Sequence, residues 1–212
     1  MSFAVVLMIG FVWMQQVELP IPPPPNRHAI FKGETDLCDL FDADCEDVRV
    51  VFAIDCSASM RRIWEEVVGS AEGAVSELPP NALFNIVLFS SACEGGAVAW
   101  RGGVVAADAR SKAEAMRWLR QRRPAGCSVL LEALKTAFSL SRRVSVFLVA
   151  DDYPNTGETE ACEIMEAAWR LVSQNGGRLN TILVSEDEKA AELLAELAYR
   201  CGGSFRFRAP SK

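Results

Sequence analysis

Apolar residues recur with two different periods along residues 48–208, and the way these periods alternate predicts the fold. Short runs of β-branched and other apolar residues predict strands at 48–54, 84–89, 97–100, 144–150, 179–184 and 204–208. Between them, apolar positions three or four residues apart predict helices over 61–78, 111–122, 129–140, 159–175 and 188–200. Strands and helices are therefore expected to alternate.

This alternation predicts an α/β fold with a doubly wound, mostly parallel six-stranded sheet and helices on both faces. Gly95 and Gly96 leave only a short connection before 97–100, which is therefore expected as an antiparallel edge strand. The runs 48–54 and 144–150 are the most continuously apolar, as is typical of strands covered on both faces. We expect these two strands to be neighbours at the centre of the sheet.

The helices carry two further local signals. Ser111 and Glu114 have the spacing of a capping box, in which the serine begins the helix 111–122. Met165, Trp169 and Val172 lie along the helix 159–175 and are expected in the core.

The first 47 residues differ in composition from the domain that follows, residues 48–208. Residues 1–18 form an apolar leader whose longest run, 3–14, is shorter than the roughly 20 residues of a membrane-spanning helix. One interpretation of the leader is a signal or membrane anchor, which implies a secreted protein or a membrane-associated protein tethered through residues 3–14. The other interpretation is a buried segment of a cytoplasmic protein. Residues 19–47 form a proline-rich and acidic linker.

Charge and cysteine content narrow the classes of partner. The formal net charge is -6 over 212 residues, which argues against nucleic acid as the main partner, because nucleic-acid binding needs a broad basic surface. The seven cysteines include no C-x-x-C pair and His28 is the only histidine, so a structural zinc site lacks its usual ligand spacing. A cation bound by oxygen ligands, or a basic protein surface, fits the acidic chain better.

Oxygen-bearing side chains gather where the two central strands are expected to end. Asp55, Ser57 and Ser59 directly follow the first of them, and Asp151 follows the second. Ser128 stands just before the helix 129–140 and supplies a third hydroxyl. Two facing carboxylates repel each other unless a divalent ion offsets their charge. Mg²⁺, or Mn²⁺ or Ca²⁺ in its place, suits such a set of oxygen donors.

These residues resemble the metal-ion-dependent adhesion site of the von Willebrand factor A and integrin I-domain family. The signature of that family is D-x-S-x-S followed by a later threonine and a later aspartate, and the resemblance spans residues 48 to about 207. It implies that Asp55, Ser57, Ser59, Ser128 and Asp151 hold the metal. It also implies that the serine hydroxyls touch the ion, whereas the aspartates act largely through water or hydrogen bonds.

The sequence departs from the family pattern at three positions near the site. Ser128 replaces the family threonine and lacks the methyl group that stiffens the side chain. Ala58 replaces a usual glycine. Asp152 stands where the family commonly has glycine, and its carboxylate either strengthens cation binding as an accessory ligand or repels an acidic partner. Cys56 and Cys127 flank ligand positions, either as a redox-sensitive pair or as two small buried side chains.

The resemblance implies a non-enzymatic module that binds a protein partner through the metal, with an acidic side chain of the partner reaching the ion. Two alternatives stay open. One is a magnesium-dependent phosphohydrolase of haloacid-dehalogenase-like type, although Ser57 stands where that class has its acid–base aspartate. The other is a degenerate A-domain scaffold without metal, in which the serines only cap helices.

Overall fold

The structure is a computed structural model and describes residues 48–208. Its strands are β1 (Arg49–Asp55), β2 (Leu83–Phe89), β3 (Ala97–Ala99), β4 (Val105–Ala106), β5 (Ser145–Ala150), β6 (Arg178–Leu183) and β7 (Phe205–Phe207). Its helices are α1 (Trp64–Glu77), α2 (Ala109–Arg120), α3 (Leu130–Ser139), α4 (Ala161–Asn175) and α5 (Glu188–Arg200), with short 3-10 helices η2 (Ala58–Arg62) and η3 (Glu94–Gly96). Strands and helices alternate as predicted.

The strands form one mixed sheet in the order β3-β2-β1-β5-β6-β7, and β4 also pairs with β2. β1, β2, β5, β6 and β7 are parallel, whereas β3 and β4 run antiparallel to β2. The predicted doubly wound sheet with its antiparallel edge is confirmed, and β1 and β5 are central neighbours. The structure adds β4, a pair of residues too short to show a pattern in the sequence.

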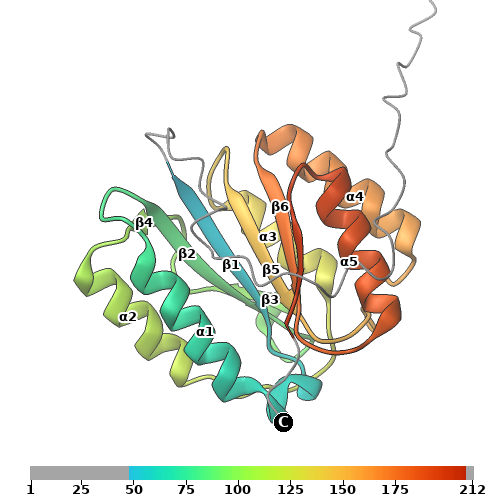
Figure 1. The fold of residues 1–212 in the computed structure, drawn as a ribbon, viewed down its shortest axis with the longest axis horizontal. Helices are drawn as coiled ribbons and strands as arrows, with labels where there is room; N and C mark the ends of the chain where they lie inside the picture. The colour runs from blue at the N-terminus through green and yellow to red at the C-terminus, as the bar shows by residue number, and fades with distance from the viewer. Residues whose placement is uncertain (1–47, 209–212) are drawn as a thin grey trace, which may run out of the picture.

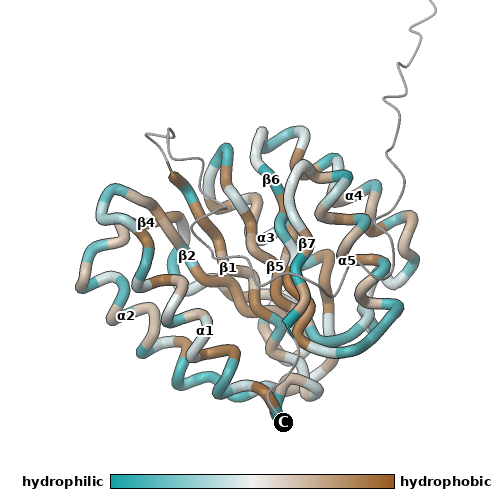
Figure 2. The backbone as a smooth tube through the Cα atoms, viewed as in Figure 1, coloured by the Kyte–Doolittle hydropathy of each residue, from teal (hydrophilic) through white to brown (hydrophobic). Residues whose placement is uncertain are grey.

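The helices cover both faces of the sheet, with α1 and α2 on one side and α3, α4 and α5 on the other (Figure 1). Along β1 the side chains alternate between these layers, so that Phe52 and Ile54 pack toward α1 and α2, while Val51 and Ala53 pack toward α3. Hydrophobic residues are concentrated along the central strands (Figure 2). Because both faces are covered, ligands can approach mainly at the edge where the strands end.

The predicted capping box is wrong. Helix α2 begins at Ala109, and its N-cap is Asp108, whose carboxylate accepts a hydrogen bond from the Ser111 amide at 2.7 Å. Glu114 instead pairs with Arg101 and Arg110. An aspartate is at least as good an N-cap as a serine, and its charge also favours the helix N-terminus, so it displaces the expected start.

One expected core residue lies at the surface. Trp169 on α4 is 56% exposed, whereas Ile164 and Ala168 on the same helix are fully buried against the sheet. Met165 and Val172 are partly buried at the margin of that contact. The face of α4 that meets the sheet is therefore rotated away from the one expected.

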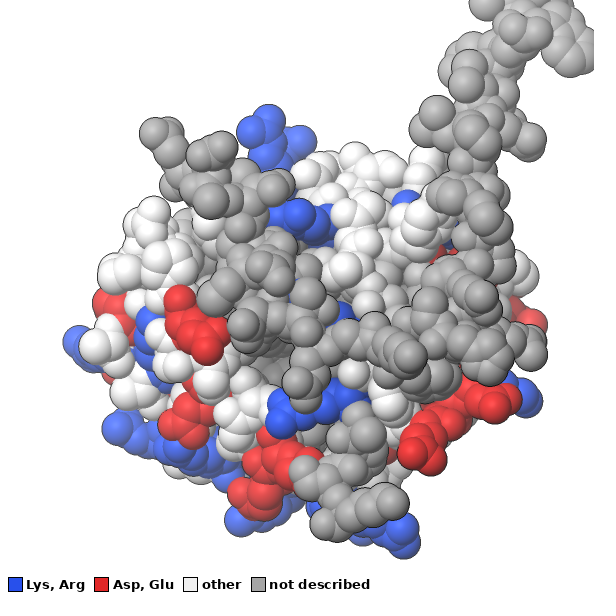
Figure 3. Space-filling view, in the orientation of Figure 1, with Lys and Arg blue, Asp and Glu red and all other residues white. Residues whose placement is uncertain are grey.

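The surface of the described domain mixes charges of both signs. In Figure 3, basic and acidic side chains alternate on the visible part that the structure describes, and Arg120 of α2 pairs with Glu72 of α1. None of the helices within residues 48–208 is both long and apolar enough to cross a membrane. The predicted leader, 1–18, and linker, 19–47, lie outside the described residues.

Candidate metal centre

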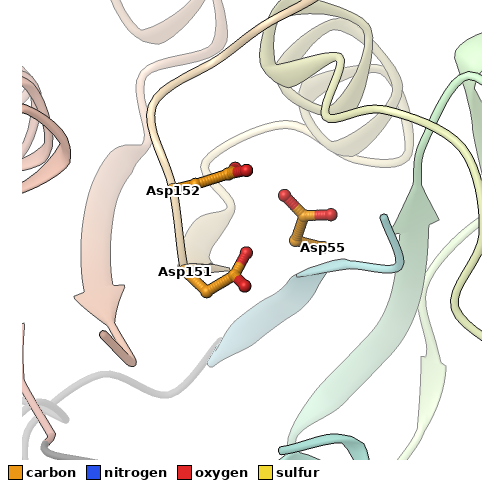
Figure 4. A group of neighbouring side chains, drawn as sticks. All are labelled: Asp55, Asp151 and Asp152. Carbon is orange, nitrogen blue, oxygen red and sulfur yellow. The ribbon is translucent and has the colours of Figure 1, made fainter. Parts of the chain in front are cut away.

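Three carboxylates meet at the edge of the sheet where β1 and β5 end. Because β1 and β5 are parallel and paired up to Ile54 and Val149, Asp55 and the residues after Ala150 emerge side by side. One oxygen from each of Asp55, Asp151 and Asp152 lies within 4.8 Å of the others. Figure 4 shows the three carboxylates directed toward a common space. This edge is the switch point at which open α/β sheets bind ligands.

Asp55 is fully buried beneath this space. Its Oδ1 accepts a hydrogen bond from the Ser57 amide at 2.7 Å, and its Oδ2 accepts one from the Ser128 hydroxyl at 2.7 Å. Burial raises the pKa of Asp55 to about 6, although both serines act in the opposite direction by stabilising the ionised form. The two hydrogen bonds thus hold the Asp55 side chain in one orientation, but they offset only part of the cost of removing the ionised carboxylate from water.

A chain of hydroxyl groups joins the β1 end to the β5 end. The hydroxyl oxygens of Ser57 and Ser59 are 2.9 Å apart, and the Ser59 hydroxyl donates to Asp151 Oδ1 at 2.9 Å. The helix predicted over 61–78 begins at Trp64 as α1, and η2 before it (Ala58–Arg62) turns the chain directly after Ser57 and carries Ser59 across to Asp151. Burial also raises the pKa of Asp151.

The loop before α3 is fastened against the loop after β1. The amide of Ala58 donates to Gly126 O at 2.9 Å, and the amide of Ala125 donates to Cys56 O at 2.8 Å. Gly126 has a φ of +78°, and a Cβ there would lie 2.8 Å from the amide nitrogen of Ala92. Only glycine fits this close approach, which places Ser128 over Asp55.

Asp152 is the least satisfied of the three carboxylates. Its Oδ1 is buried and has no hydrogen-bond partner among the described residues, while its Oδ2 accepts a long bond of 3.4 Å from Asn155. The Ser59 hydroxyl lowers the pKa of Asp152, but less than burial raises it. Burial, together with the charges of Asp151 and Asp55, raises the pKa of Asp152 to about 7. A buried carboxylate oxygen without a donor is the feature expected where a cation completes the site.

Two polar residues support the site without having been singled out from the sequence. Asn155 Oδ1 accepts from the Ser128 amide at 3.1 Å, and its amide group also reaches Asp152. Ser185, just after β6, donates its hydroxyl to the carbonyl oxygen of Asp151. The position of Ser185 at the end of the next parallel strand was the available signal, whereas Asn155 lies in a loop whose course the sequence pattern does not define.

The cysteines near the site differ in accessibility. Cys56 is buried and Cys127 is exposed, and both are free thiols, so the expectation of two small buried side chains is wrong for Cys127. Burial raises the pKa of Cys56 to about 12, and Cys93 on the β2–β3 connection contributes to the rise.

The donor set fits a hard divalent cation. Three carboxylates and three hydroxyls supply only oxygen atoms, which Mg²⁺ and Ca²⁺ prefer. Ser128 and Ser59 direct their hydroxyl hydrogens at Asp55 and Asp151, so their oxygen lone pairs remain available to an ion. All five residues predicted from the sequence, and Asp152, are thus brought together at one edge of the sheet.

Comparison with known proteins identifies relatives of this fold. Residues 48–207 match the sequence model of the von Willebrand factor type A domain. The human (Homo sapiens) protein named von Willebrand factor A domain-containing protein 3B is 27% identical over 177 residues, which are 82% of this chain and 13% of that protein. The chain therefore spans only a small part of this relative.

Solved structures show the same fold. A von Willebrand factor type A protein from Catenulispora acidiphila aligns with a TM-score of 0.65 at 21% identity, covering 76% of this chain and 38% of the other. The pilus adhesin SpaC from Lactobacillus rhamnosus GG, in its open conformation, aligns with a TM-score of 0.61 at 12% identity, covering 78% and 28% of the two chains. At these identities the likeness concerns the fold alone.

Proposed function

The chain belongs to the von Willebrand factor type A domain family, and from this premise we propose that it is a non-enzymatic module that binds a protein partner through a divalent cation. Domains of this family are generally interaction modules. The observation that carries the proposal is the convergence of Asp55, Asp151 and Asp152 within 4.8 Å, with Asp152 Oδ1 buried and lacking a donor among the described residues.

Mg²⁺ is the proposed ion, with Mn²⁺ or Ca²⁺ as substitutes. We assign the hydroxyl groups of Ser57, Ser59 and Ser128 and the carboxylates of Asp55 and Asp151 to its binding, and Asp152 as an accessory ligand. The carboxylates orient the hydroxyls by accepting their hydrogens at 2.7 and 2.9 Å. A bound cation would supply a positive charge and an open coordination position for an acidic group.

The protonation state of Asp152 sets the net charge that an acidic partner meets at the site. With Asp152 ionised, the three carboxylates carry one more negative charge than a divalent ion neutralises. With Asp152 protonated, the charges balance, and a carboxylate from the partner meets less repulsion. The raised pKa of Asp152, about 7, is that of the cation-free chain, and a bound divalent ion would favour the ionised form. We therefore propose that the negative charge of Asp152 weakens the binding of acidic partners.

The first test is cation binding to the purified chain by isothermal titration calorimetry. We expect the wild type to bind Mg²⁺ and the Asp55→Asn variant to lose most of this binding, while the Glu186→Gln variant binds as the wild type does. Glu186 is exposed and is not one of the proposed ligands, so this control removes one negative charge outside the ligand set. A folded wild type that gives no heat with millimolar Mg²⁺ or Mn²⁺ would support the scaffold without metal.

The second test concerns the partner and the enzymatic alternative. Proteins captured by the immobilised chain in Mg²⁺ should be released by EDTA and should not be captured by Asp55→Asn. The same preparations are assayed with a general phosphomonoester substrate. Turnover that depends on Asp55 would overturn the proposal in favour of a haloacid-dehalogenase-like phosphohydrolase, in which an aspartate attacks phosphorus.

A further inference from the structure

Cys56 lies between two of the proposed ligands and beside the end of β2. Its amide donates to Phe89 O at 2.9 Å, so Cys56 continues the parallel pairing of β1 with β2 by one position. Ser90 is the residue opposite it, and paired strands lie about 4.8 Å apart. The main chains of Cys56 and Ser90 are therefore close neighbours.

The side chains of Cys56 and Ser90 point to the same side of the sheet. Cys56 packs in the same cluster as Ile54, toward α1 and α2, and on β2 Leu88 belongs to that cluster as well. Side chains alternate along a strand, so Ser90, two residues after Leu88, faces the same way. Cys56 and Ser90 are both buried.

Cys93 approaches the same place from the β2–β3 connection. The amide of Cys93 donates to Ser90 O at 2.9 Å, which closes a turn, and its sulfur lies 3.6 Å from the Ser90 hydroxyl oxygen. Cys93 is also near enough to act electrostatically on the Cys56 thiol. Ser90 thus neighbours both cysteines, Cys93 through its hydroxyl and Cys56 across the strand pair.

We propose that Cys56 and Cys93 form a reversible disulfide that ties the loop after β1 to the β2–β3 connection. Cys127, which the sequence offered as one possible partner of Cys56, is less suited, because its amide and carbonyl are both held by Ser91 and its side chain is exposed. The pairing joins two positions that share Ser90 as a neighbour, Cys56 across the strand pair and Cys93 through the turn.

A small disulfide such as glutathione disulfide supplies the oxidising equivalents. The more accessible thiol, Cys93, attacks one sulfur of glutathione disulfide as its thiolate, forming a mixed disulfide and releasing one glutathione. Cys56 then loses its proton and attacks the Cys93 sulfur, forming the internal disulfide and releasing the second glutathione; this step is slower than the first, because burial raises the pKa of the Cys56 thiol to about 12. Two thiols are oxidised, one disulfide is reduced, and the two thiol protons end on the two glutathione molecules.

The consequence for cation binding rests on the proposed function. Drawing the Cys56 sulfur toward Cys93 displaces the backbone between Asp55 and Ser57, whose amide–carboxylate hydrogen bond of 2.7 Å orients Asp55. We expect the oxidised protein to bind Mg²⁺ about ten-fold more weakly than the reduced protein, as for other changes to groups that orient metal ligands.

The test uses the full chain treated with glutathione disulfide, then alkylated, digested with trypsin and analysed by mass spectrometry. Cleavage after Arg49, Arg61, Arg62 and Arg101 places Cys56 in peptide 50–61 and Cys93 in peptide 63–101. We expect these two peptides to be joined in the wild type and in Cys127→Ser, and to be separate in Cys93→Ser and after dithiothreitol. Calorimetry measures the Mg²⁺ affinity of the wild type and of Cys93→Ser, each before and after the glutathione treatment. The treatment should leave the affinity of Cys93→Ser unchanged.

Cys56 found alkylated as a free thiol, or joined to the peptide containing Cys127, overturns the disulfide. A joined pair with equal Mg²⁺ affinity in both redox states overturns its effect on the site. If the reduced chain binds no Mg²⁺ at all, the proposed function fails, while the peptide map still decides the disulfide independently.

Discussion

Individual carboxylates at the edge of β1 and β5 are held close together at an electrostatic cost. Two short hydrogen bonds compensate Asp55 in part, and the Ser59 hydroxyl compensates Asp151 in part, but burial still raises the pKa of both carboxyls. Among the described residues, Asp152 has the distant amide of Asn155 and a partial stabilisation by the Ser59 hydroxyl, which leaves the pKa of Asp152 raised to about 7. In the absence of a cation, ionised Asp152 therefore opposes folding, and in the presence of one it contributes to binding.

The Asp152→Asn variant should separate these two effects. Without divalent cations at about pH 8, its free energy of unfolding should be about 1 kcal/mol higher than that of the wild type, after discounting for solvent screening of this partly exposed side chain. Its affinity for Mg²⁺ should fall, because one negative charge is lost. Urea denaturation and calorimetry measure the two quantities, and Glu186→Gln controls for net charge. Lower stability of the cation-free variant would contradict the account of Asp152 as uncompensated.

The pH dependence of stability follows from the raised pKa values. Asp55 titrates at about 6 and Asp152 at about 7 in the folded chain, against a usual value of 3.8. The folded chain therefore holds these protons more tightly than the unfolded chain, and the free energy of unfolding should fall as the pH rises from about 4 to about 7. Urea denaturation across this range without divalent cations checks the trend.

Millimolar Mg²⁺ should reduce or reverse this fall, because the ion binds the ionised carboxylates and competes with protons. In Asp152→Asn without Mg²⁺, the part of the fall near pH 7 should be absent. An identical pH profile in this variant and the wild type would show that the titration belongs to other groups.

At the scale of strands and loops, tight backbone contacts fix the spacing of the site. The loop before α3 is bonded to the loop after β1 through the Ala58 amide and Gly126 O. Asn175 holds the opposite end of β5 in place. Its side chain accepts a hydrogen bond from the Val144 amide and donates hydrogen bonds to the carbonyl oxygens of Phe138 and Ser141. The β5 end that carries Asp151 is thus anchored at a distance from the site.

Two glycine-to-alanine substitutions should have opposite effects on stability. Gly126→Ala should lower the free energy of unfolding by about 2 kcal/mol, since the residue has a positive φ and its Cβ would press on the Ala92 backbone. Gly73→Ala, in the exposed middle of α1 with open space around it, should raise the free energy of unfolding by up to about 1 kcal/mol. Only Gly126→Ala should also weaken Mg²⁺ binding, measured by calorimetry. Equal effects of the two substitutions would contradict a special role for the Gly126 turn.

The elements could be predicted from the sequence wherever periodicity was strong. The β1 and β5 runs predicted two buried strands and hence the meeting of Asp55 with Asp151. The D-x-S-x-S motif supplied Ser57 and Ser59, and Ser128 was found from its place before the helix 129–140. Periodicity could not show β4, which has two residues, or the choice between Asp108 and Ser111 as the start of α2, since both are good caps. It also could not place Asn155, because contacts made by loops depend on the finished tertiary structure.

At the scale of the whole domain, the site joins the two layers that the sheet separates. Residues after β1 lead into α1 on one face, whereas Ser128 precedes α3 on the other face and Asp151 precedes α4. An ion bound by these residues would therefore connect chain segments belonging to both hydrophobic clusters. Cation binding should accordingly stabilise the domain as a unit and not only the loops.

Thermal unfolding followed by far-ultraviolet circular dichroism tests this consequence. Because the unfolded chain does not preserve the site, Mg²⁺ at about 100 times its dissociation constant should add about 2.7 kcal/mol to the free energy of unfolding and raise the melting temperature. NaCl at equal ionic strength controls for simple screening of the three carboxylates, which acts at any salt. The Asp55→Asn variant should show the NaCl response but not the additional magnesium response. Only an ion held between β1, β5 and the α3 loop makes the effect of magnesium differ from that of sodium. An equal rise of the melting temperature in both salts would therefore mean that screening alone reduces the repulsion between the carboxylates.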